Sequence, residues 1–198
     1  MDCVPFILES WRETLQEAGH IFTYRNLQAY SGMDGAWMLE RLLPTETHGA
    51  REKLLKSQGE RYRNDFIERA QAFSAVHPLF ESLKRHGICI GIATTCKKDE
   101  LAIYDRRMGI LELVDAVACG EMVRHGKPDP GLLGQCRRSL HLPDPSRAVA
   151  IGDTPFDAFA AKAAGMRAVG VLTGGFAGAL LAHGLRCFWP PRQARARW

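Results

Sequence analysis

The chain of 198 residues is 46% hydrophobic and 24% charged, a composition typical of a globular protein with one core and at most a small inserted subdomain. Its formal net charge of +4 leaves a near-neutral body once four arginines near the C-terminus are set aside, so we expect no nucleic-acid partner; these are Arg186, Arg192, Arg195 and Arg197. No apolar run approaches the roughly 20 residues that cross a bilayer, and the N-terminus lacks the pattern of a signal peptide, so we expect no membrane partner.

The first part of the chain shows helical periodicity and no strand pattern. Apolar side chains recur at helical spacing within residues 4–18, and a second short helix is expected over 23–30. A third helix follows over 37–42, and a longer one is expected over 49–73. Because the rest of the chain is patterned differently, these four helices predict a helical cap over residues 4–73.

From residue 78 onward, helix and strand alternate. Such an alternation implies right-handed crossovers and a parallel sheet, so we predict an α/β core over residues 74–184. The last residues, 185–198, show neither strand alternation nor a helical stripe and predict an irregular tail. Buried strands are expected over 88–93, 115–119, 148–151 and 169–172, separated by helices over 79–85, 99–107, 130–140 and 155–164.

Two acidic residues follow the third expected strand. Asp153 and Asp157 lie at its carboxyl end, beside Gly152, and open parallel sheets bind ligands at that edge. Carboxylate oxygens suit a hard cation such as Mg²⁺, so the pair predicts a metal site. The same residues would also be explained if Asp153 only capped the following helix and Asp157 faced solvent.

Two further motifs precede this acidic pair. Thr94 and Thr95 end the first expected strand, and the segment Gly-Lys-Pro-Asp-Pro over 126–130 contains Lys127. Each motif alone has an ordinary explanation. A Thr at a strand end often makes hydrogen bonds to its local backbone, and a Lys in a loop is usually solvated. In this order, however, the three motifs resemble the haloacid dehalogenase superfamily, and its phosphoglycolate-phosphatase-like branch in particular, over about residues 2–175.

The resemblance implies an α/β fold with a Rossmann-like parallel sheet core and an inserted α-helical cap. It implies a phosphatase-type hydrolase that cleaves phosphate monoesters through an aspartyl-phosphate, with Mg²⁺ as cofactor. Thr94, helped by the backbone of Thr95, would bind a phosphoryl oxygen, and Lys127 would bridge nucleophile and phosphate. Asp153 would ligate the metal, and Asp157 would orient the site or bind the metal through water. We expect Asp129 to fix its loop rather than to take part in the chemistry.

One family motif is missing from the chain. The nucleophile and the general acid lie in an Asp-x-Asp-Gly-Thr segment after the central first strand of this fold, and Asp2 corresponds to the residue just beyond that segment. The hypothesis that we favour is therefore a hydrolase shortened at its N-terminus and inactive as written, without its central first strand. Loss of this strand would leave unpaired edges at 88–93 and 148–151.

Two other hypotheses stay open. The chain could be a non-catalytic relative that binds a phosphorylated ligand or acts as a scaffold. A nucleotide-binding fold of other ancestry is disfavoured, because neither Gly-x-Gly-x-x-Gly nor Gly-x-x-x-x-Gly-Lys-[Ser/Thr] occurs. By resemblance the ligand is a small phosphorylated metabolite, such as phosphoglycolate or a sugar phosphate. Six cysteines without metal-binding spacing indicate reduced thiols and a cytoplasmic protein.

Overall fold

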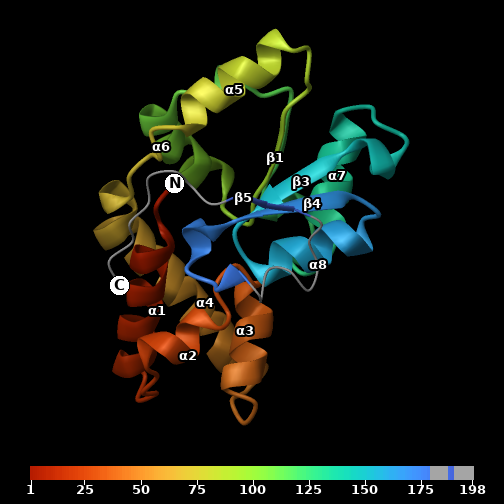
Figure 1. Cartoon of the computed structure of the whole chain (residues 1–198). Helices are drawn as coiled ribbons and strands as arrows, with labels where there is room; N and C mark the ends of the chain where they lie inside the picture. The colour runs from red at the N-terminus through yellow and green to blue at the C-terminus, as the bar shows by residue number, and fades with distance from the viewer. Residues whose placement is uncertain (179–186, 190–198) are drawn as a thin grey trace. The chain divides into compact units, whose positions relative to one another are not determined.

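The computed structural model describes residues 1–178 and 187–189 (Figure 1). The chain divides into two compact units. Met1–Ile90 and Cys96–Asp115 form one, here called the helical unit. Gly91–Thr95 and the described residues from Ala116 onward form the other, here called the sheet unit. The division does not follow the expected boundary at residue 73, because two helices beyond it belong to the helical unit; a separable cap over 4–73 stays a prediction.

The helical unit consists of consecutive helices with capped ends. Thr23 caps α2, since its side chain accepts the backbone N–H of Asn26 at 3.2 Å. Within residues 4–73 no strand joins either sheet, and the β pairing there is one isolated bridge, from Gln71 to Asp2. The elements are α1 (Val4–Glu17), α2 (Tyr24–Gln28), α3 (Gly35–Leu42), α4 (His48–Arg61), the π-helix η1 (Tyr62–Phe66), the 3₁₀ turns η2 (Ile67–Arg69) and η3 (Leu111–Leu113), α5 (Val76–Arg85) and α6 (Lys98–Met108).

The long helix expected over 49–73 is divided into α4, η1 and η2, and the last two of these attach α6 to the helical unit. The buried hydroxyls of Tyr62 and Tyr104 share a hydrogen bond of 2.5 Å. Nearby, Arg106 donates to the carboxylate of Glu68 at 3.0 Å, and the backbone carbonyl of Glu68 accepts from Arg107 at 2.8 Å. These contacts explain why α6 groups with the helices although it follows the first strand in sequence.

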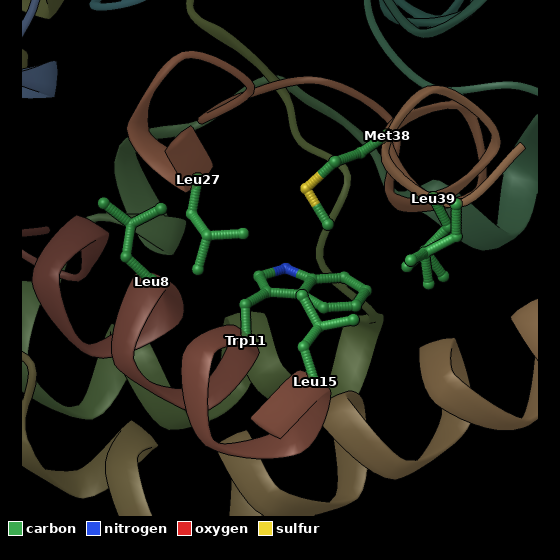
Figure 2. Packing of buried hydrophobic residues seen from close by; sticks show 7 residues of the cluster. Leu8, Trp11, Leu15, Leu27, Met38 and Leu39 are labelled. Atoms are coloured by element: carbon green, nitrogen blue, oxygen red, sulfur yellow. The ribbon is translucent and has the colours of Figure 1, made fainter. Parts of the chain in front are cut away.

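A tryptophan lies at the centre of the core between α1, α2 and α3. Figure 2 shows the Trp11 ring between the side chains of Leu15, Leu27 and Met38. Only 6% of Trp11 is exposed, and Leu15 and Leu27 are fully buried. The apolar stripe of α1 therefore buries its largest side chain against two other helices, and this burial stabilises the helical unit.

The sheet unit contains two parallel sheets. β1 pairs with β2, and β3, β4 and β5 pair in that order, so the parallel α/β fold is confirmed. The register places Ile151 opposite Val169 and Gly152 opposite Gly170. The elements are β1 (Gly91–Ala93), β2 (Ala116–Ala118), η4 (Gly120–Met122), α7 (Gly131–Ser139), η5 (Pro145–Arg147), β3 (Val149–Gly152), α8 (Pro155–Ala163), β4 (Arg167–Val171), η6 (Leu172–Gly174) and β5 (Cys187–Trp189).

Two helices connect the sheets. α7 contacts β1 and β2, α8 contacts β3 and β4, and α7 also contacts α8. Leu132 and Cys136 of α7 are buried against Ala116 and Ala118 of β2. Among the described residues β1 has hydrogen-bonded neighbours only in β2, and β3 only in β4, so each keeps one unpaired edge.

The expectation of an irregular tail over 185–198 is wrong for residues 187–189. Their backbone forms β5, with Gly170 opposite Phe188 and Val171 opposite Trp189. The edge of β4 that does not pair with β3 offers N–H and C=O groups to a further strand, and aromatic residues favour strands. These residues therefore form a strand although their sequence lacks the alternation of apolar and polar residues. The remainder of that segment lies outside the described residues.

None of the helices that the structure describes combines the length and the apolar character needed to cross a membrane. In the described part no disulfide joins Cys3, Cys89, Cys96, Cys119 and Cys136.

We expect Trp11→Ala to lower the free energy of unfolding by about 3–5 kcal/mol, because it leaves a cavity at the centre of the helical core. Urea unfolding followed by circular dichroism measures this change. Ile21→Ala is the control, since Ile21 is 88% exposed and its removal should change the free energy by less than about 0.5 kcal/mol. Equal effects of the two substitutions would contradict the assignment of Trp11 to the core.

Candidate active site

A tight turn between β3 and α8 brings Asp153 and Asp157 together at the carboxyl end of β3. Thr154 is the N-cap of α8, because its side chain accepts the backbone N–H of Asp157. Gly152 is required at the end of the strand, since a Cβ there would lie only 2.2 Å from the Cβ of Asp157. The alternative that Asp153 caps this helix is therefore wrong, because Thr154 occupies the capping position.

Both carboxylate oxygens of Asp157 are engaged. The ammonium of Lys127 donates to Oδ1 at 2.6 Å, and the Thr154 hydroxyl donates to Oδ2 at 2.7 Å. The backbone N–H of Thr154 adds a third bond to Oδ2 at 3.0 Å. The side chains of Lys127 and Asp157 are each only 17% exposed. The alternative in which Asp157 faces solvent is therefore wrong.

Asp153 is held more loosely. The hydroxyl of Thr173, in the turn after β4, donates to Oδ2 of Asp153 at 3.0 Å. No donor from the described residues reaches Oδ1 of Asp153. Gly174 lies against the same residue, since a Cβ on Gly174 would be 2.2 Å from the backbone oxygen of Asp153. One carboxylate oxygen is thus fixed and the other is left to accept a further partner.

The two carboxylates differ in acidity. Burial raises the pKa of Asp153, and the negative charge of Asp157 adds to the rise, while Thr173 and Lys127 oppose it. Burial also acts to raise the pKa of Asp157, but the charge and hydrogen bond of Lys127, with the bonds from Thr154, leave that pKa below its usual value. One cation faces two carboxylates, so the cluster carries one uncompensated negative charge, which falls mainly on Asp153.

The other expected phosphate-binding residues lie at the end of β1. The backbone N–H of Thr94 donates to the carbonyl of Ala118 at 2.9 Å, which continues the pairing of β1 with β2. The backbone of Thr95 lies against Gly120, where a Cβ would be 2.4 Å from the Thr95 oxygen. Both threonines therefore belong to the sheet unit, as do Lys127, Asp153 and Asp157, but they end a strand of the other sheet.

The loop before α7 agrees with its expected role. Oδ1 of Asp129 accepts the backbone N–H of Gly131 at 2.7 Å, next to the first residues of α7. This bond fixes the turn that follows Lys127. Asp129 is therefore structural, which confirms the sequence-based interpretation.

Comparison with known proteins decides the family. The profile of the haloacid dehalogenase-like hydrolases matches residues 1–171. The chain belongs to the haloacid dehalogenase-like hydrolase family. Because the match covers most of the chain, both the helical unit and the sheet unit fall within this hydrolase family.

Proteins similar to this chain include two enzymes and a solved structure. A pyrophosphatase, PpaX, of Bacillus velezensis is 33% identical over 99 residues, 50% of this chain and 45% of the relative. A phosphorylated carbohydrates phosphatase of Thermotoga maritima is 25% identical over 172 residues, 85% of this chain and 78% of the relative. A hydrolase from Pseudomonas syringae superposes with a TM-score of 0.87 at 24% identity, covering 96% of this chain and 88% of that one, and shows the shared fold. The chain spans about half the length of the pyrophosphatase relatives that it matches.

The acidic pair of this chain has one carboxylate oxygen available for a divalent cation. Oδ1 of Asp153 accepts no hydrogen bond from the described residues, and the pKa of this carboxyl is raised by burial and by a second carboxylate. A hard cation with oxygen ligands would offset that charge. Across residues 1–178 and 187–189 no three His, Cys, Asp or Glu side chains gather to hold a metal, and the metal-binding role of Asp153 and Asp157 stays a prediction.

Three residues of the site escaped the sequence analysis. Thr154 carried a signal, since the spacing Thr-x-x-Asp from Thr154 to Asp157 is that of a capping box. Thr173 and Gly174 carried none, because they reach Asp153 only through the pairing of β3 with β4. Gly174 could be read only as part of a glycine pair with Gly175.

The unequal acidities predict opposite effects of two matched substitutions. In a buffer with chelator at pH 7, Asp153→Asn should raise the free energy of unfolding by about 0.5–2 kcal/mol, because it removes an uncompensated charge. Asp157→Asn should lower it by about 1–3 kcal/mol, because it leaves the ammonium of Lys127 without its carboxylate. Urea unfolding of both variants measures the two signs, and equal signs would contradict this charge distribution.

The pH dependence of these effects follows from the two pKa directions. Since the pKa of folded Asp153 is raised, its destabilising charge disappears as pH falls through that pKa, and the advantage of Asp153→Asn should shrink with it. Since the pKa of folded Asp157 is depressed, its stabilising contribution is present above the unfolded value, near 3.9, and is lost as pH falls toward the folded value. Unfolding curves from pH 7 to about pH 3 measure both trends. A constant advantage of Asp153→Asn over this range would contradict the raised pKa.

Proposed function

We propose that this haloacid dehalogenase-like chain carries the phosphate and metal site of a Mg²⁺-dependent phosphate monoester hydrolase. The observation that supports it most is the contact of Lys127 with Asp157 beside the half-engaged Asp153, at the carboxyl ends of β3 and β4. Ligands of open parallel sheets bind at this edge. A scaffolding role alone gives no reason to keep a charge-imbalanced carboxylate pair, which costs stability.

The residues of the site have separate tasks in this proposal. Asp153 would hold Mg²⁺ through Oδ1, and Asp157 would act through water, because both of its own oxygens are occupied. Bound Mg²⁺ would supply positive charge against the phosphoryl oxygens. Lys127 would add a second positive charge, and the Thr94 hydroxyl with the Thr95 backbone N–H would donate hydrogen bonds to the phosphate.

The described residues do not supply an obvious nucleophile, and the sheets leave a place for one. β1 and β3 each have an unpaired edge, and on β3 the side chains of Val149 and Ile151 are 47% and 61% exposed. We propose that the active enzyme has a further strand between β1 and β3, ending in Asp-x-Asp-Gly-Thr. Its first carboxylate would attack phosphorus and expel the alcohol, which takes a proton from the second Asp; water would then hydrolyse the acyl phosphate.

The substrate class follows from the relatives only in outline. The Thermotoga maritima relative, aligned over most of this chain, is named for phosphorylated carbohydrates, and the relative that matches about half of it is a pyrophosphatase. We propose a small phosphorylated metabolite, with a sugar phosphate preferred over a diphosphate because the longer alignment includes more of the chain. A cytoplasmic location is proposed from the six cysteines, whose spacing indicates reduced thiols.

The test compares the printed chain with a version extended at its N-terminus by a strand that ends in Asp-x-Asp-Gly-Thr. We expect the extended form to hydrolyse p-nitrophenyl phosphate with Mg²⁺ and not with excess chelator, and the printed chain to show no turnover. Asp153→Asn in the extended form should lower turnover about 10²–10³-fold while circular dichroism stays unchanged.

Each outcome separates the hypotheses. Mg²⁺-dependent turnover by the printed chain would contradict the proposed additional strand. Undiminished turnover of Asp153→Asn would contradict the metal assignment. A folded extended form that binds phosphate esters without hydrolysing them would favour the non-catalytic relative instead.

A further inference from the structure

Thr173 belongs to none of the motifs that identify the family, yet its side chain reaches the acidic pair. It lies in η6, beyond the end of β4, and twenty residues separate it from Asp153. Its hydroxyl donates to Oδ2 of Asp153 at 3.0 Å. Within the described residues this is the hydrogen bond that the Asp153 carboxylate receives.

The contact between Thr173 and Asp153 results from the pairing of β3 with β4 rather than from the local sequence. β3 and β4 are parallel, and the last residue of β3, Gly152, lies opposite Gly170, one residue before the end of β4, so the segments after both strands leave the same edge of the sheet. The turn then lies against Asp153, since a Cβ on Gly174 would be 2.2 Å from its backbone oxygen and 3.1 Å from its Cγ. Gly175 ends the turn with a φ of +76°, in the left-handed region that favours glycine. The backbone position of Thr173 is therefore fixed from two sides.

The hydrogen bond determines which way the Asp153 carboxylate faces. A carboxylate can rotate about its χ2 angle with little preference, so a single donor at one oxygen sets its plane. With Oδ2 directed at Thr173, Oδ1 is the oxygen that stays free of described donors. Asp157 is oriented in the same manner, since the Thr154 hydroxyl binds its Oδ2 and leaves Oδ1 to Lys127. Each carboxylate thus has one oxygen bound to a threonine hydroxyl, while the other oxygen accepts from Lys127 in Asp157 and from no described donor in Asp153.

We propose that Thr173 is a positioning residue that orients Asp153 so that Oδ1 faces the divalent cation. The inference rests on the proposed function, because it assumes a metal at Asp153, and it adds to that function a residue outside the family motifs. Removing a residue that orients a metal-ligating side chain typically weakens metal binding 10–100-fold. A purely structural Thr173, which only links two turns, would change stability without changing metal affinity.

The experiment titrates Mn²⁺ into the 198-residue chain and follows the free ion by electron paramagnetic resonance. Thr173→Val keeps the shape of the side chain and removes its hydroxyl, so we expect it to weaken Mn²⁺ binding about 10–100-fold. Thr173→Ser restores a hydroxyl at the same place and should bind within about threefold of the unaltered chain. Thr45→Val makes the same chemical change at an exposed residue of the helical unit and should leave binding unchanged.

The outcomes distinguish the two levels of the proposal. Absence of Mn²⁺ binding by the unaltered chain, or equal binding by Asp153→Asn, would contradict the metal site itself and the positioning role with it. Binding that Asp153→Asn abolishes but Thr173→Val leaves intact would overturn only the role of Thr173. Urea unfolding of each variant accompanies the titration, and weaker binding by Thr173→Val at unchanged stability, rescued by Thr173→Ser, supports the role.

Discussion

The ion pair between Lys127 and Asp157 is the contact on which the site depends. It connects the loop before α7 with the first turn of α8 across thirty residues of sequence, at a distance of 2.6 Å and with little exposure of either side chain. Pairs of this kind are costly to break, because each partner would remain desolvated without compensation. Because Lys127 and Thr154 together satisfy Asp157, the excess negative charge of the two carboxylates falls mainly on Asp153.

The unequal charge compensation gives different environments to Asp153 and Asp157, which look alike in sequence. Asp157 is saturated with donors and behaves as part of the scaffold, while Asp153 keeps one oxygen for a partner outside the described chain. Environment rather than residue type assigns the roles, as is general for paired carboxylates whose pKa values are displaced in opposite directions. The threonines that flank the pair, Thr154 and Thr173, make the assignment geometric as well as electrostatic.

The sequence was informative where local chemistry determines structure. The segment from β3 to β4 was predicted in type and order, because its strands are apolar and its helix begins with proline; Lys127 and the two aspartates were found by their motif. The π-helix over Tyr62–Phe66 was not predicted, since one extra residue in a turn hardly changes helical periodicity. β5 and the contact of Thr173 were missed because both depend on the edge of β4, which no local pattern encodes.

Gly152 and Gly174 allow the backbone to close tightly around the acidic pair. A Cβ on Gly152 would lie 2.2 Å from the Cβ of Asp157, and a Cβ on Gly174 would lie 2.2 Å from the backbone oxygen of Asp153. Because other residues at positions 153 and 157 would have the same backbone oxygen and Cβ, exchanging the acidic side chains would not make room for a side chain at either glycine. These two turns can therefore change the charge of the site more readily than they can change its glycines.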